Sequence, residues 1–188
     1  MAGTAWNSLE VVKLVVAAAT PVLVLLLGVV VSRAARRLEE AQWANRKLIE
    51  RRLELYDEMA ERLNDLYCFF GLFGNFREVE PPVAVRRKRE FDKVFHVNEF
   101  LMGPEFAKRY KEFMEACFQT YTGVAEDAKL RSPVAYQCME RQRWDPAWDR
   151  CFVGSEEVTP IATVEQRYRS LMACFAGLIG VQQDGRSG

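Results

Sequence analysis

The apolar run from Leu14 to Val31 is the feature that most constrains what this chain can fold into. Its eighteen residues carry no charge, and Lys13 and Ser32 bound it on the two sides. At about 1.5 Å per residue, an α-helix of this length covers about 27 Å, close to the roughly 30 Å of a bilayer's hydrocarbon core. The run therefore predicts a transmembrane helix, which we expect over residues 11–32.

A cleaved signal peptide and a buried core helix are the alternatives to a membrane span. A signal peptide starts with basic residues and has an apolar core of about 7–15 residues, whereas residues 1–10 contain no Lys or Arg and the run is longer. A soluble core helix normally keeps a polar stripe. Here only Thr20, Pro21 and Gly28 interrupt the run, and membrane helices tolerate all three.

The basic residues that flank the run predict its orientation. Only Lys13 precedes it, whereas seven basic residues follow within the next twenty positions: Arg33, Arg36, Arg37, Arg46, Lys47, Arg51 and Arg52. Cytoplasmic flanks carry the excess of Lys and Arg. We therefore expect a single-pass protein of the inner or plasma membrane, with an external N-terminus anchored by Trp6 and a cytoplasmic C-terminal domain.

Composition disfavours several other classes of protein. The 26 basic and 26 acidic side chains cancel, so no basic excess points to nucleic acid as a partner. The five cysteines are widely spaced and form no CxxC pair, which argues against a disulfide framework and a zinc site. With the single His96, the sequence predicts no metal site and no cofactor.

The sequence after the run predicts an all-α architecture. Residues 33–70 contain no Gly or Pro and are rich in Glu, Arg, Leu and Ala, which favours one long helix. Its apolar rows are interrupted by Gln42, Asn45 and Arg52 but become continuous from Leu53 onward. We therefore expect a charged stalk helix that runs into a small cytoplasmic helical bundle, with a short coiled-coil dimer of the stalk as an alternative. The predicted domains are a short external tail over 1–10, the transmembrane helix over 11–32, the juxtamembrane stalk over 33–52, the helical bundle over 53–181 and a flexible tail over 182–188.

Gly and Pro breaks divide the rest of the bundle sequence into further helices. These are expected over about 83–101, 104–130, 132–144 and 159–179, and no alternating pattern predicts a strand. Phe113 lies on the apolar face of the segment 104–130, and we expect it in the core. The aromatic stretch Cys68–Phe76 is interpreted as core beneath a turn, with an exposed docking patch as the alternative.

Four consecutive basic residues form the most concentrated charge of the domain. Consecutive helical positions point around most of the cylinder, so we expect these side chains to be largely solvated. Together with the basic residues after the span, they are candidates for contact with anionic lipid headgroups or with a protein partner. The candidate contact residues are Arg33, Arg36, Arg37, Arg86, Arg87, Lys88 and Arg89.

Motifs that would name a reaction are absent from the sequence. It contains no phosphate-binding GxxxxGK, GxGxxG, HExxH or GxSxG pattern. Asp92 lies one turn before His96 and could orient it, and a Cys-His pair is the remaining route to catalysis. We interpret the chain as a non-enzyme.

Two functions from different classes follow from this architecture. The first is a membrane-anchored interaction or scaffold module that holds a protein partner at the cytoplasmic membrane face, with self-association into a homo-oligomer as an option. The second is a membrane-active effector of a bacterial defence or toxin system, with the helical domain as its sensor. The span has no charged lining for a pore, which favours the scaffold.

Overall fold

The computed structural model describes residues 8–120 and 127–181 of the chain. Most of the predicted external tail, Trp6, and the predicted flexible tail over 182–188 lie outside these residues. So does the stretch 121–126 of the predicted 104–130 helix. The described chain forms two compact units, Met1–Lys47 and Leu48–Gly188.

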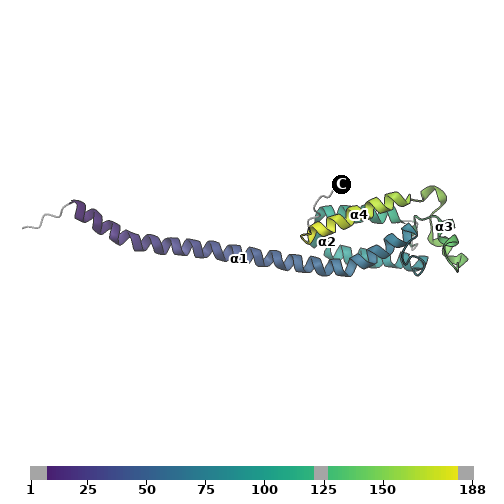
Figure 1. The fold of residues 1–188 in the computed structure, drawn as a ribbon, viewed down its shortest axis with the longest axis horizontal. Coiled ribbons are helices and arrows are strands. Elements are labelled where there is room, and N and C mark those ends of the chain that lie inside the picture. The colour runs from purple at the N-terminus through teal and green to yellow at the C-terminus, as the bar shows by residue number, and fades with distance from the viewer. Residues whose placement is uncertain (1–7, 121–126, 182–188) are drawn as a thin grey trace, which may run out of the picture. The chain divides into compact units, whose positions relative to one another are not determined.

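Helices dominate the described chain, which confirms the predicted mostly helical class (Figure 1). The elements in chain order are α1 (Ser8–Gly71), α2 (Pro81–Cys117), β1 (Phe118–Gln119), β2 (Lys129–Leu130), α3 (Val134–Met139), the 3₁₀ turns η1 (Pro146–Cys151) and η2 (Ser155–Glu157), and α4 (Ile161–Leu178).

The first unit is helical and apolar. One helix of the described chain is long and apolar enough to cross a membrane, with a window of mean hydropathy 2.1 of which no part is buried. Pro21 lies inside α1 without ending it. The exposed fractions of Leu25 and Leu27 are 71% and 62%, so no described residue covers this apolar surface.

The second unit has a core of its own. The C-terminal part of α1, α2 and α4 contribute its side chains, and α2 and α4 pack along one another. The aromatic rings that are almost fully buried are Phe69, Phe95, Phe106, Tyr110, Phe113, Phe118 and Phe175. Phe106 meets Phe175 edge to face at 4.8 Å between ring centroids, and Phe95 stacks on Tyr110 at 4.1 Å.

α2 combines two of the predicted helices across a kink. Gly103 breaks the helical conformation with φ 79° and ψ 168°, a conformation that favours glycine, and Pro104 follows it. The predicted break at Gly103-Pro104 is therefore a kink between two helical segments.

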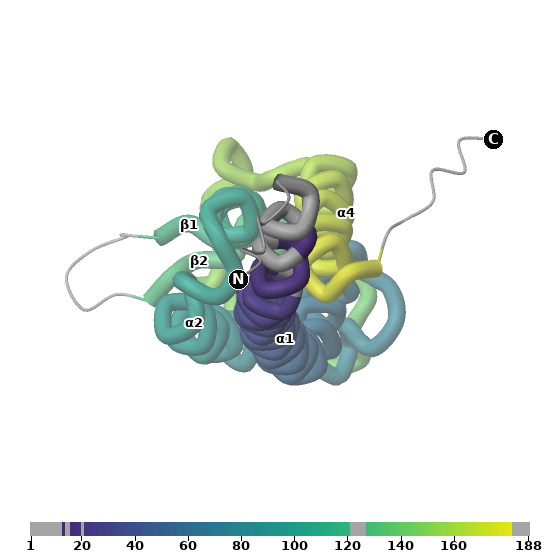
Figure 2. Tube along the Cα trace, turned by 90° about the vertical axis from the view of Figure 1, so that its left-hand side faces the viewer, coloured from purple at the N-terminus to yellow at the C-terminus, as the bar shows by residue number. Residues whose placement is uncertain are grey.

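The predicted extension of that helix to Leu130 is wrong. α2 ends at Cys117, and Phe118–Gln119 pairs antiparallel with Lys129–Leu130 beside α2 (Figure 2). The expectation of no strand is wrong for the same reason. The sequence after Cys117, Phe-Gln-Thr-Tyr-Thr-Gly, is poor in helix formers. The Arg131 amide donates to the Cys117 carbonyl at 2.9 Å, so the hairpin satisfies a carbonyl at the helix end.

The C-terminal segments follow the predicted order with one correction. The helix expected to reach Trp144 is the short α3, which ends at Met139. Trp144 instead donates its indole N–H to Asp149 of η1 at 2.9 Å, and the Asp145 carboxylate accepts from the Ala147 amide at the start of η1. These side-chain bonds favour the 3₁₀ turn over a longer α-helix. α4 matches the predicted last helix to within two residues.

The aromatic stretch after α1 belongs to the core. Phe69, Phe70 and Phe76 are at most 3% exposed, and Gly74 turns the chain with φ 62°. A Cβ added at Gly71 would lie 2.3 Å from the Phe73 ring, so this close approach requires glycine. The interpretation of Cys68–Phe76 as core beneath a turn is therefore confirmed for these rings, whereas Phe73 is 43% exposed.

The fragment 38–188 should be soluble and strongly helical, because the second unit has its own core. Far-ultraviolet circular dichroism of the purified fragment checks this. A spectrum dominated by strand, or a fragment that stays aggregated without detergent, would contradict the architecture.

Replacing Phe113 by Ala should lower the free energy of unfolding by about 3–5 kcal/mol, because the ring is fully buried and its removal leaves a cavity. Urea unfolding of the fragment 38–188 measures the change. Met139→Ala is the matched control, since Met139 is 80% exposed and its loss should change stability by less than about 0.5 kcal/mol.

Candidate partner-binding surface

The juxtamembrane candidates Arg33, Arg36 and Arg37 lie on α1 and are exposed. None of them forms an ion pair within the part of the chain that the structure describes. Their guanidinium groups are therefore open to solvent or to an external anion, as their assignment as headgroup or partner contacts requires.

The four consecutive basic residues of α2 differ in their surroundings. Arg86 and Arg89 are exposed, Arg87 is half-buried, and Lys88 is buried with 8% of its surface exposed. The expectation that all four are largely solvated is wrong for Lys88. Consecutive side chains do point around the helix, and the side chain of Lys88 points toward the core of the second unit.

Lys88 is held by a carboxylate of the same unit, and a phenol donates a hydrogen bond to that carboxylate. Its Nζ lies 2.5 Å from Oδ2 of Asp92, and the Tyr110 hydroxyl donates to Oδ1 of Asp92 at 3.0 Å. Burial, and then the Asp92 charge, raise the pKa of Tyr110 well above its ordinary value, so the phenol stays protonated and donates. The role of Lys88 is to neutralise Asp92 beside the core, which leaves it unsuited to an external partner.

Two further members of the run are ion-paired. Arg87 lies 2.7 Å from Oδ2 of Asp65 on α1, with both side chains about one-fifth exposed, and so joins α2 to α1. Arg89 pairs with Asp127 at the surface, where both groups are about 60% exposed and the pair contributes little stability. Of the four predicted contact residues on α2, Arg86 alone forms no ion pair with any described residue.

His96 has surroundings different from those expected. It is 61% exposed, and its Nδ1 lies 3.6 Å from Glu99, whereas Asp92 is engaged by Lys88 and Tyr110. The expectation that Asp92 orients His96 is therefore wrong. Asp92 lies four residues from both Lys88 and His96. It pairs with Lys88, which is the more buried of the two.

The thiols of the second unit are shielded. Burial raises the pKa of Cys117 well above its ordinary value, and it raises the pKa values of Cys68, Cys151 and Cys174 as well. A protonated thiol is a poor nucleophile. Among the described residues, no three His, Cys, Asp or Glu side chains gather as metal ligands.

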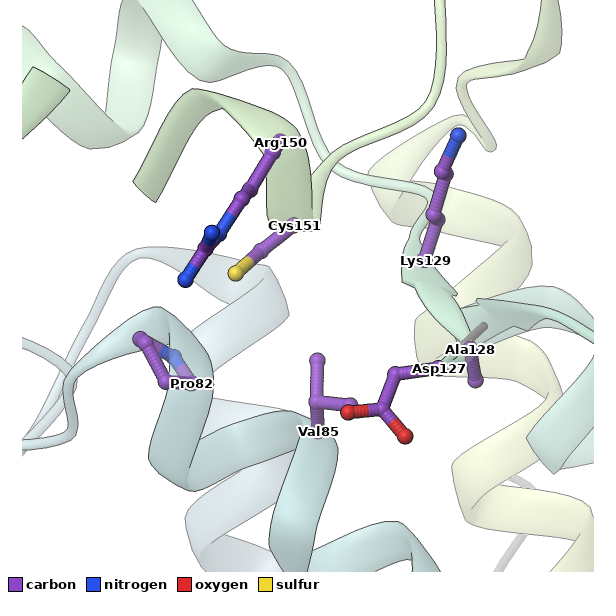
Figure 3. Close-up of a pocket in the computed structure, with 7 residues that line it drawn as sticks. All are labelled: Pro82, Val85, Asp127, Ala128, Lys129, Arg150 and Cys151. Carbon is purple, nitrogen blue, oxygen red and sulfur yellow. The ribbon is translucent and has the colours of Figure 1, made fainter. Parts of the chain in front are cut away.

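A cavity of about 400 Å³ lies between α2, β2 and η1 (Figure 3). Cys151 points into it from η1, and Val85 faces it from α2. Arg150 lowers the pKa of the Cys151 thiol less than burial raises it, so the group remains a thiol. The cavity is lined by Pro82, Val85, Asp127, Ala128, Lys129, Arg150 and Cys151. His96 is not among these residues, so the cavity lacks a base for a Cys-His pair.

Two arginines outside the predicted contact residues hold the unit together. Arg52 donates from Nε to the Leu101 carbonyl at 2.8 Å and from a terminal nitrogen to the Leu178 carbonyl at 3.4 Å. Arg141 donates to the carbonyls of Phe76, Arg77 and Val79 and lies over the Phe69 ring. Helix ends and turns leave carbonyls unpaired, but sequence alone does not reveal which arginine reaches them.

No known protein family, curated protein or solved structure matches the chain. The site geometry, together with the exposed apolar surface of the first unit, is what remains to indicate a function.

Lys88→Ala should lower the free energy of unfolding of the fragment 38–188 by about 1–2 kcal/mol, since it leaves the Asp92 carboxylate without its cation. Arg86→Ala is the control on the same helix and should change stability by less than about 0.5 kcal/mol. Urea unfolding measures both. Equal losses in the two variants would contradict the structural role of Lys88.

Proposed function

We propose that this protein is a membrane-anchored interaction module that holds a protein partner at the cytoplasmic face of the membrane. The observation that carries the proposal is the apolar part of α1, which no other described part of the chain covers. Water makes such a surface costly, by about 25 cal/mol for each Å² exposed, and a bilayer removes that cost.

The second unit supports the binding half of the proposal. It buries its own core, so it needs no help from the apolar segment to fold. Its exposed helix faces carry charges that have no partner within the described chain, whereas the pKa of its buried Cys117 thiol is raised and its one histidine is exposed. A folded unit tethered in this way binds its partner at a raised effective concentration.

The orientation of the proposed anchor rests on the distribution of basic residues. Lys13 precedes the apolar run, and seven Lys or Arg residues follow it within twenty positions. Under the rule that cytoplasmic flanks are the more basic, the second unit is cytoplasmic and Arg33, Arg36 and Arg37 face anionic headgroups. Each of these cations would add about 1 kcal/mol to attachment.

The full chain should remain in the membrane pellet after alkaline extraction, and a reporter active only in the cytoplasm should be active when fused after Gly188. A Leu23→Arg/Leu26→Arg variant should move to the soluble fraction, because each arginine near the centre of a span costs about 2.5–3.5 kcal/mol. The matched control is Leu23→Ile/Leu26→Ile, which should stay in the pellet.

Digestion of the C-terminal unit by protease added outside intact cells would contradict the proposed orientation. Depolarisation of cells on expression of the wild-type chain, with no protein recovered alongside it from mild detergent, would overturn the interaction module in favour of a membrane-active effector.

A further inference from the structure

The outward face of α1 in the second unit is acidic. Its exposed carboxylates recur at helical spacings of three and four residues, so they share one face. They are Glu54, Asp57, Glu58 and Glu61. Glu54 pairs with Arg51 at 2.7 Å. Asp57, Glu58 and Glu61 form no ion pair or side-chain hydrogen bond with any described residue, and Leu53 at the edge of the face is 47% exposed.

The outward face of α2 is basic at one end and apolar at the other. Arg86 and Lys93 are exposed, and neither has an ion-pair partner in the described ranges. Val97 and Phe100 continue the same face with exposed fractions of 72% and 97%. A phenyl ring so fully exposed is the kind of aromatic anchor that interfaces bury. Glu90 is the exposed acid at the edge of this face.

Two contacts fix how these faces align within one chain. Arg52 of α1 bonds Leu101 of α2, and Asp65 of α1 pairs with Arg87 of α2, so the two helices run antiparallel. Counting between the two contacts places Lys93 level with the turn that carries Glu58 and Glu61. The same count places Phe100 level with Leu53 and Glu90 level with Arg62.

We propose that these two faces dock onto a second copy of this chain. A two-fold axis parallel to the helices sets the α1 face of one protomer against the α2 face of the other at the same level. Lys93 then meets the partner copy's Glu58 and Glu61, and Phe100 packs on its Leu53 at the edge of the same face. Because the contact is isologous, every pairing occurs twice.

A second copy is favoured over other occupants by the match of sign and register. A uniformly anionic bilayer would complement α2 but repel α1, whereas each face of this chain complements the other. The inference rests on the proposed membrane anchoring for one step: two anchored copies of the chain are held in one bilayer. Confinement to the bilayer raises the effective concentration, so a modest interface suffices.

A charge-swap experiment on the full chain tests this dimer. The acidic-face variant is Glu58→Lys/Glu61→Lys, and the basic-face variant is Lys93→Glu. Two differently tagged copies are co-expressed, solubilised in mild detergent and co-purified through one tag. Wild type should co-purify with wild type. Each variant should lose at least ten-fold of its own co-purification, because like charges then face each other at both contacts.

Co-expression of the two variants together should restore pairing. The lysines of one then face the glutamates of the other at both contacts, and recovery should approach the wild-type level. The matched controls reverse exposed charges elsewhere, in Glu115→Lys/Glu156→Lys and Lys108→Glu/Arg143→Glu, and should co-purify as wild type does. Phe100→Ala should weaken pairing without lowering the helix content of the chain.

Pairing that survives in all variants would overturn the proposed face, and so would failure of the mixed pair to recover. If the basic-face variant lost binding to anionic lipid but still paired with itself at the wild-type level, that face would be assigned to the bilayer instead. Alkaline extraction of the same membranes separates the two proposals: a chain that stays in the pellet but does not pair retains the anchor and loses only the dimer.

Discussion

The free-energy cost of exposing apolar surface to water is the constraint on which both units of this protein depend. The two parts of α1 meet it in different ways. Over residues 21–31, apolar side chains surround the helix and no described residue covers them. From Leu55 on, they narrow to a stripe that α2 and α4 cover, with Leu55, Leu63 and Leu66 fully buried. One helix therefore leaves its first apolar part uncovered and has its second apolar part covered by tertiary packing.

Packing of the second unit depends in turn on satisfying carbonyl groups where helices end. α2 is kinked at Gly103, and α4 ends at Leu178, so carbonyls near both places lack the usual helical partner. Arg52 donates to one carbonyl in each helix and so joins three helices through one guanidinium. Arg141 does the same for the turn after α1. Desolvation lowers the pKa of Arg141 while the nearby Glu80 raises it, so the group is a partly buried cation matched to carbonyl oxygens.

Helix content and core were predictable from sequence because periodic apolar residues report burial locally. The spacing of Phe106, Tyr110 and Phe113 predicted a buried face, and all three rings are at most 2% exposed. The end of that helix was not predictable from its spacing, since Cys117 is followed by residues that pair with Lys129–Leu130 across a connection in the sequence. Likewise, Asp92 is four residues from both His96 and Lys88, and the spacing alone does not show which of them it contacts. In the structure, Asp92 faces Lys88 and Tyr110.

The same limit explains why four adjacent cations have different surroundings in the structure. A run of consecutive residues spreads around a helix, so tertiary packing divides it: Arg87 and Lys88 turn toward Asp65 and Asp92 inside the unit, and Arg89 reaches Asp127. What remains open to a partner is a row at helical spacing, which starts at Arg86 and continues through Lys93 to Phe100. Such a row is visible in the sequence only after burial has shown which side of α2 faces outward.

The acidic row on α1 follows the same logic, because its carboxylates become a surface only when Leu55, Met59 and Leu63 point the other way. The fold leaves these charges unpaired and fixes the register of the helices that carry them. These two properties are therefore the most direct support for the proposed partner.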